Sequence, residues 1–307
     1  MIYSNQINKL MVLKYAEQFA PIIEQKYAKE LTSYDLFQSN KQVKFMDAQT
    51  IKLPSITLSG YKDHTRGSLG FNTGTITNDW EPKKLEHDRS VEFVIDPMDV
   101  DETNKVVSIG NVQSTLEEEQ AIPEKDSYVY SKLYKEAETY AANGATISTE
   151  ALTAENILVQ FDVAMEKMDE AGVPAAGRLL YVTPKVNKLF KEAKDIQRVM
   201  GVTGEGSIKR TVHDLDDVKI IVVQSARLKS KFNFTEGCVP AEDAKQINFI
   251  LVHPTAVIAR DKYSYINVFE PGSDSRTADN YLLQSRFYMD AFLVKNRANG
   301  IFINAQA

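Results

Sequence analysis

The chain has 307 residues, which is enough for about two domains or for one domain with large extensions. Hydrophobic residues make up 43% and charged residues 25%, which is typical of globular proteins and excludes a largely disordered chain. A formal net charge of -6 argues against a surface that mainly neutralises phosphates, because such binding needs clustered Lys and Arg. The single cysteine, Cys238, excludes an internal disulfide framework and fits a reducing compartment.

The ends and the apolar runs of the chain give no sign of membrane insertion. The stretch from Met1 to Lys9 lacks a basic region followed by a continuous apolar run, so we expect no signal peptide. The longest apolar runs, such as Ile220 to Val223, are far shorter than the roughly 20 residues that span a bilayer. The sequence therefore predicts a soluble protein made in a cytoplasm.

The first 40 residues are predicted to form an arm of one or two helices. Apolar residues recur at helical spacing, and Pro21 breaks or restarts the helix. These apolar positions are Leu10, Leu13, Ala16, Phe19, Ala20, Ile23, Tyr27 and Leu31.

A long β-ribbon is predicted next. Strand patterns cover Thr50 to Leu58, Thr75 to Trp80 and Lys84 to Ile95, with a glycine cluster between the first two. An isolated two-stranded ribbon is marginal in water because it cannot bury enough surface against itself. We therefore expect this ribbon to lie on another subunit.

An acidic corner, Asp96 to Asn104, joins the ribbon to a helical region. After a short acidic turn capped by Ser114 or Thr115, Pro123 is predicted to interrupt the helix. Asp126 is then predicted to cap a long helix, which Asn143-Gly144 ends through a left-handed cap. The buried stripe of that helix is predicted to hold Val129, Leu133, Ala137 and Tyr140.

From Ser148 onward the pattern is that of an α/β domain with its own core. A helix is predicted over 152–171, and Thr183-Pro184 is predicted to start another. The predicted strands of this part are Arg178 to Val182, Val218 to Gln224, Ile247 to Val252, Tyr263 to Phe269, Asn280 to Val294 and Gly300 to Asn304. Alternation in the long C-terminal segments favours antiparallel pairing.

A search for chemistry finds no ligand or phosphate motif. The four histidines are dispersed, and none has the spacing of a zinc or iron site. The acidic corner resembles a calcium-binding loop but has Asp101 where glycine is needed and Val107 where the bidentate Glu is needed. Gly201 to Ser207 is rich in glycine but lacks the Gly-Lys-Ser/Thr of a phosphate-binding loop, so a flexible loop is the preferred interpretation.

Nucleophiles are equally unsupported. Cys238 has no local base, and no Gly-x-Ser-x-Gly elbow occurs. Lys62 paired with Asn296 or Asn299 has the residue types of an isopeptide crosslink, but an ordinary exposed lysine and turn asparagine are preferred. We therefore predict no catalytic, cofactor-binding or metal-binding residues, no cofactor, and no enzymatic activity.

The order of these parts, together with two segments, resembles the major capsid proteins of tailed bacteriophages. The segments are Asp88 to Asn104 followed by Glu117 to Asp126, and the C-terminal runs Ala256 to Asp261 and Tyr288 to Val294. The resemblance covers most of the chain from about residue 40 onward and implies an α+β protein with the Hong Kong 97-type capsid fold.

The resemblance also implies a domain division. Residues 1–40 would be the N-terminal arm, 41–95 the extended β-ribbon loop, and 96–147 the peripheral domain with the spine helix. Residues 148–262 would be the axial α/β domain, and 263–307 the returning strands that complete both domains.

The function implied is that of a major capsid protein, which self-assembles into the icosahedral shell around the double-stranded DNA genome of a phage. The expected partners are many copies of itself in pentamers and hexamers, a separate scaffolding protein, a portal, and packaged DNA bound without sequence specificity, with no membrane. The expected location is the virion capsid, assembled in the bacterial host cytoplasm. One alternative is the shell protein of an encapsulin-like bacterial nanocompartment, and a second is a soluble α/β nucleotide-binding hydrolase acting at the glycine-rich loop.

Overall fold

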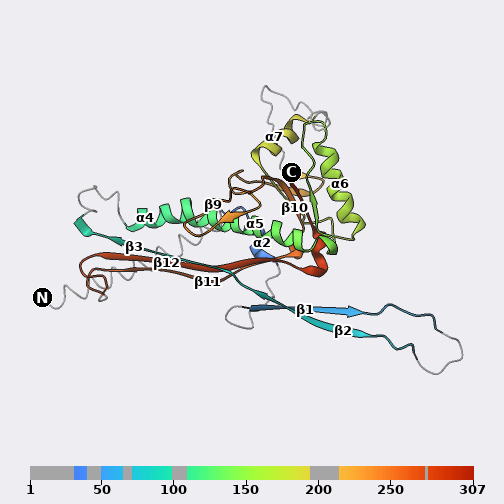
Figure 1. Cartoon of the computed structure of the whole chain (residues 1–307), viewed down its shortest axis with the longest axis horizontal. Coiled ribbons are helices and arrows are strands. Elements are labelled where there is room, and N and C mark those ends of the chain that lie inside the picture. The colour runs from blue at the N-terminus through green and yellow to red at the C-terminus, as the bar shows by residue number, and fades with distance from the viewer. Residues whose placement is uncertain (1–30, 40–49, 65–70, 99–108, 194–213, 274–275) are drawn as a thin grey trace, which may run out of the picture. The chain divides into compact units, whose positions relative to one another are not determined.

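The computed structural model describes residues 31–39, 50–64, 71–98, 109–193, 214–273 and 276–307 (Figure 1). The chain divides into two compact units: residues 41–86, and the rest of the chain. The predicted arm helices, the core of the acidic corner and the glycine-rich loop Gly201–Ser207 lie outside the described residues.

The smaller unit is a two-stranded antiparallel ribbon. Strand β1, Thr50–Leu58, pairs with β2, Ile76–Lys84, in a register that sets Thr50 opposite Lys84 and Leu58 opposite Ile76. Each strand contains a proline within its span, Pro54 in β1 and Pro82 in β2, which a strand tolerates where one edge is unpaired. The predicted ribbon is confirmed, and among the described residues no third strand joins it.

The strand predicted to end the ribbon belongs to the larger unit instead. The pattern from Lys84 to Ile95 contains the end of β2 and a separate strand β3, His87–Ile95. Strand β3 pairs with β12, Tyr281–Leu293, and not with β1. The ribbon unit therefore stops at residue 86 rather than at the expected boundary, because β3 finds its partner far away in the sequence.

Strand β12 is the centre of a three-stranded antiparallel sheet of order β11-β12-β3. Strand β11, Val257–Phe269, runs beside β12 for its full length with one register shift between Asp261 and Tyr263. The predicted antiparallel pairing of the long C-terminal strands is thus confirmed. Strand β11 starts earlier than the predicted Tyr263 because Val257 to Ala259 are buried against the core.

A nearly continuous helix runs along this sheet (Figure 1). It consists of α4, Ile109–Thr115, a π-helical segment η1, Leu116–Ala121, and α5, Ile122–Thr139. The predicted interruption at Pro123 is wrong, because Pro123 lies at the start of α5 directly after the π-helix. In an α-helix its ring would meet the carbonyl of Glu119, and the wider π turn relieves this clash.

The end of α5 follows the sequence prediction. After Tyr140 a 3₁₀ turn, Ala141–Asn143, leads to Gly144 at φ 102. A Cβ at residue 144 would lie 3.0 Å from the Cβ of Asn299, so both the backbone conformation and the space require glycine.

The second half of the chain forms a six-stranded mixed sheet of order β4-β13-β10-β5-β7-β6. Its strands are β4 Thr146–Ser148, β5 Leu179–Val182, β6 Asp214–Leu215, β7 Val218–Val222, β10 Ile247–Val252 and β13 Ile301–Ala305. Its helices are α6 Ile157–Glu170 and α7 Pro184–Glu192. Helix α7 starts at Thr183-Pro184 as predicted, and the Thr183 side chain caps it by accepting from the Val186 N–H. The shorter elements are α2 Tyr34–Gln38, β8 Phe232–Asn233, β9 Val239–Pro240, η3 Pro254–Ala256 and η4 Lys295–Gly300.

Alternate residues of the central strands face two different cores. In β5, Leu180 and Val182 pack with Phe161 of α6 and Phe190 of α7. The residues between them, Leu179 and Tyr181, pack in a second cluster with α5 and the start of β11. The six-stranded sheet is therefore covered by α6 and α7 on one face and by α5 on the other.

Candidate functional site

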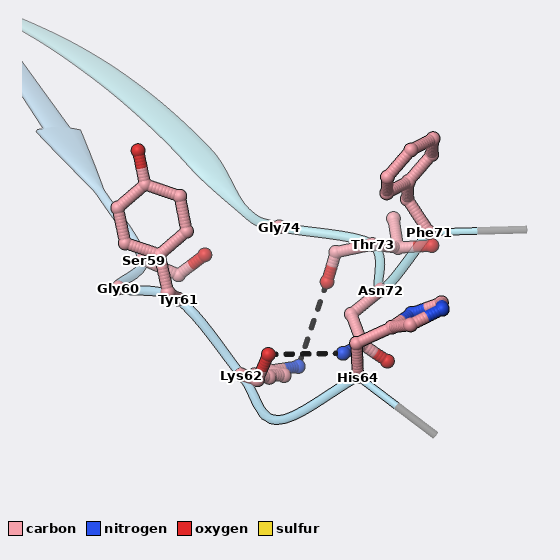
Figure 2. A pocket seen from close by; sticks show the side chains of 9 residues that line it. All are labelled: Ser59, Gly60, Tyr61, Lys62, His64, Phe71, Asn72, Thr73 and Gly74. Carbon is pink, nitrogen blue, oxygen red and sulfur yellow. Dashed lines mark hydrogen bonds between the residues drawn. The ribbon is translucent and has the colours of Figure 1, made fainter. Parts of the chain in front are cut away.

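The tip of the ribbon unit exposes apolar and aromatic side chains (Figure 2). Tyr61 and Phe71 are almost wholly exposed, at 109% and 97%, and Leu58 and Ile76 are 66% and 74% exposed. Isolated exposed apolar residues are common, but several of them at one end of a ribbon make that end a candidate interaction surface.

Hydrogen bonds shape the backbone at this tip. Asn72 donates through Nδ2 to the carbonyls of Lys62 and Asp63, at 3.2 and 2.9 Å. Lys62 Nζ lies 3.5 Å from the carbonyl oxygen of Thr73, as Figure 2 shows. The result is an open hollow of about 520 Å3 between the two sides of the loop. Its lining residues are Ser59, Gly60, Tyr61, Lys62, His64, Phe71, Asn72, Thr73 and Gly74.

A second candidate lies in the first turn of α5, where four consecutive polar residues, Glu124–Ser127, are buried. We call this segment the polar junction. Successive helix residues point about 100° apart, so the four side chains leave the helix in four directions. Buried charged residues are rare unless paired, and each of these has a partner from a different part of the chain.

Glu124 connects α5 to β3. Its Oε1 accepts a hydrogen bond from Arg89 Nε at 2.6 Å and lies 3.4 Å from Nε2 of the buried His87. Burial alone would raise the pKa of the Glu124 carboxyl, but the neighbouring His87 and the hydrogen bond from Arg89 outweigh it and lower the pKa. The guanidinium of Arg89 also donates to the carbonyl of Phe234, at 2.5 Å.

Lys125 connects α5 to β11. Its Nζ lies 3.1 Å from Asp261 Oδ1 and 4.8 Å from the centre of the Phe287 ring. Burial lowers the pKa of Lys125, and the carboxylate of Asp261 opposes that effect.

Asp126 connects α5 to the segment 31–39. It is fully buried and accepts hydrogen bonds from the backbone N–H and the hydroxyl of both Thr32 and Ser33, at 2.7 to 3.2 Å. Arg227 Nη1 donates a further bond at 3.1 Å. The prediction that Asp126 caps its own helix is therefore wrong: its carboxylate is used by backbone and side chains 93 and more residues away.

Ser127 lies beside Cys238, which belongs to the β8–β9 hairpin. Burial raises the pKa of the Cys238 thiol to about 11, so the group is a protonated thiol at neutral pH.

Comparisons with known proteins were made by sequence and by structure. No protein-family model and no curated protein sequence matches the chain. Among solved structures, the mature capsid of bacteriophage PhiM1 matches with a TM-score of 0.62 at 14% identity, covering 85% of this chain and 82% of that chain. The capsid of cyanophage P-SCSP1u matches with a TM-score of 0.60 at 13% identity, covering 86% and 85%. The head structure of Helicobacter pylori bacteriophage KHP40 matches with a TM-score of 0.56 at 10% identity, covering 86% of this chain and 87% of that chain.

The chain has the Hong Kong 97-type capsid fold. This confirms the expected α+β fold class and the resemblance to phage major capsid proteins on which it was based. The capsid fold extends over both halves of the chain, because each of these matches covers 85% or more of it.

The π-helical segment of this capsid fold contains a carboxyl group with an unusual pKa. Burial raises the pKa of Glu117 to about 7, against an ordinary value of 4.5. The folded chain therefore binds a proton that the unfolded chain has released between pH 4.5 and 7. The contribution of Glu117 to stability is present at low pH and declines as the pH rises through about 7.

We therefore expect Glu117→Gln to increase the free energy of unfolding at pH 8 by about 2 kcal/mol relative to the parent chain, with almost no increase at pH 4, where the carboxyl is protonated in both states. Urea denaturation at the two pH values measures this. Glu119→Gln, in the same π-helix but exposed, is the control and should show no such pH-dependent gain. An equal gain at both pH values would contradict the buried-carboxyl explanation.

The residues weighed for metal and covalent chemistry are dispersed in the capsid fold. Within the described part of the chain, no three His, Cys, Asp or Glu side chains gather as metal ligands do. His87 stacks on Tyr128 with ring centres 3.9 Å apart, and His253 Nδ1 lies 2.7 Å from Thr255 Oγ1. Asn299, weighed as a crosslink partner, donates instead to the carbonyl of Ala171. None of the helices in the described ranges combines the length and apolar character that crossing a bilayer requires.

Proposed function

We propose that the protein is a major capsid protein, whose copies assemble into the icosahedral shell that encloses a phage double-stranded DNA genome. One observation carries the proposal: a chain with the capsid fold presents a two-stranded ribbon that ends in exposed aromatic side chains. Exposed aromatic side chains add nothing to the stability of a free monomer. In an interface between copies, aromatic residues supply much of the binding energy.

The energetics of the ribbon support association between copies. Nine residue pairs join β1 and β2, and a two-stranded ribbon of this kind is marginal in water by itself. Contact with a neighbouring copy would bury the exposed side chains of the ribbon and hold the ribbon in one conformation. Large interfaces of this kind make folding and association interdependent.

The proposed role also assigns the parts of the chain. The arm precedes residue 41, the ribbon follows, the helix containing α5 belongs to the peripheral domain, and the sheet with α6 and α7 forms the axial domain that meets around the axes of pentamers and hexamers. The proposed partners are a separate scaffolding protein, a portal, and DNA that is packaged without sequence specificity. The proposed location is the virion, after assembly in the bacterial host cytoplasm, and the role requires no catalysis.

The test is the size and shape of the particles that the full chain forms, alone and when expressed with a scaffolding partner. Sedimentation velocity should show species in the megadalton range, and negative-stain microscopy should show closed shells of uniform diameter. Monomers or small oligomers under every condition would overturn the proposal. Closed shells that carry enzyme cargo and no nuclease-protected DNA would favour the nanocompartment alternative instead.

A further inference from the structure

The polar junction, Glu124–Ser127, contacts four segments that are distant from one another in the sequence. Asp126 holds the arm exit, residues 31–39, and Glu124 holds β3, which begins directly after the ribbon unit. Lys125 holds β11 through Asp261, and Ser127 lies beside the β8–β9 hairpin. The arm exit and β3 come directly before and directly after the ribbon unit in the sequence, and both are thus fixed to one helical turn of α5.

The four contacts are made by a rigid element in a close-packed environment. The junction residues are 0% to 7% exposed, so none of their side chains can move without displacing a neighbour. Releasing one partner leaves a buried charge unpaired, which costs several kcal/mol unless the helix itself shifts. A shift of the helix would move the neighbouring junction residues with it.

The next turn of α5 repeats the arrangement. Tyr130 hydroxyl lies 2.8 Å from Thr32 Oγ1 on the arm side, and Tyr128 stacks on His87 at the start of β3. Two successive turns therefore contact the same two segments, which increases the rigidity of the connection between them.

We propose that the polar junction couples the arm exit to β3, so that loosening either segment from α5 loosens the other. The engaged state has Ser33 on Asp126 and Arg89 on Glu124, and in the released state both contacts open together. Coupling between sites is reciprocal. A change at the arm exit must therefore loosen β3, and a change at β3 must loosen the arm exit. In a shell, docking of the arm would thereby change how firmly β3, the strand that follows the ribbon, is held on α5. Only this last step rests on the shell-forming role proposed above.

The experiment is hydrogen exchange on the unassembled full chain, followed at two groups of amides. One group is Leu36 and Ser39 at the arm exit, and the other is the set of β3 amides bonded to β12. Ser33→Ala perturbs the arm contact, and Arg89→Leu perturbs the β3 contact. Each variant is expected to speed exchange at least about fivefold in both groups. Amides of β5 and β10 report global unfolding, and the effect must exceed any change there.

Ser39→Ala is the matched control. Ser39 also lies in the arm exit, but its hydroxyl bonds to the carbonyls of Leu36 and Val257 and not to the junction. It should speed exchange at the arm exit and leave β3 unchanged. If Ser33→Ala, like Ser39→Ala, leaves exchange in β3 unchanged, the arm exit and β3 are not coupled and the proposal is wrong.

The two variants also guard against a failure to fold. If Arg89→Leu does not fold, the comparison of Ser33→Ala with Ser39→Ala at β3 still decides the question. Because exchange is read on unassembled chains, a chain that never forms shells would refute the proposed function and leave this result standing.

Discussion

Replacing Asp126 with Asn is expected to lower the free energy of unfolding by about 3 kcal/mol. The fully buried carboxylate accepts hydrogen bonds from Thr32, Ser33 and Arg227, and an amide offers only one acceptor oxygen in its place. The partly buried Arg227 guanidinium would lose its charged partner, and a backbone N–H of the arm exit would be left unsatisfied. Urea denaturation of the unassembled chain, followed by circular dichroism, measures the loss.

Asp243→Asn is the control for this experiment. Asp243 also pairs with a basic residue, since Lys231 Nζ lies 2.7 Å from its Oδ2, but both side chains are more than 60% exposed. Exposed ion pairs contribute little, so the free energy of unfolding should stay close to that of the parent chain. Equal effects of the two substitutions would show that Asp126 does not anchor the arm exit.

The double substitution Tyr61→Ser and Phe71→Ser is expected to impair assembly without affecting folding. Both rings are almost wholly exposed, so their loss should change the free energy of unfolding by less than about 0.5 kcal/mol. Aromatic residues at the centre of an interface contribute about 2 kcal/mol or more each, so the chain concentration needed for shell formation should rise more than about tenfold. Light scattering during assembly measures that concentration.

Val159→Ser provides the comparison for the tip variant. Val159 is an apolar residue on α6 that is 57% exposed, and its replacement removes apolar surface outside the ribbon unit. Assembly of this variant should stay within about twofold of the parent chain. Normal assembly of the tip variant would show that the aromatic tip is not an interface.

Strand and helix positions were predictable where local pattern determines them. Strands β1 and β10 match the predicted spans, and the cap at Thr183 and the left-handed Gly144 follow from turn chemistry alone. The long C-terminal strands were also predictable because their alternation extends over many residues.

Elements that depend on distant partners were not predictable from local pattern. The run from Lys84 to Ile95 reads as one strand, yet its second part leaves the ribbon because β12, nearly 200 residues later, offers a partner. Likewise, a proline normally ends a helix. No pattern in the sequence indicates the π-helix that allows the helix to continue through Pro123.

The polar junction was missed for a related reason. Glu124, Lys125 and Asp126 at a helix start are typical of a solvated first turn that complements the helix dipole. Their burial follows from the arm exit, β3, β11 and the hairpin packing around one turn, and these segments come from four separate parts of the sequence. Only the tyrosines that follow, Tyr128 and Tyr130, indicated that this part of the helix is surrounded.

The ribbon contains the chain's single tryptophan, Trp80 on β2 opposite Pro54, whereas the larger unit is rich in tyrosine. Tryptophan emission therefore reports on the ribbon alone, and tyrosine absorbance reports mainly on the body of the chain. The two spectroscopic signals separate events that a single global probe would merge. Ordering of the ribbon against a neighbour can be timed by fluorescence while the integrity of the larger unit is followed independently in the same sample.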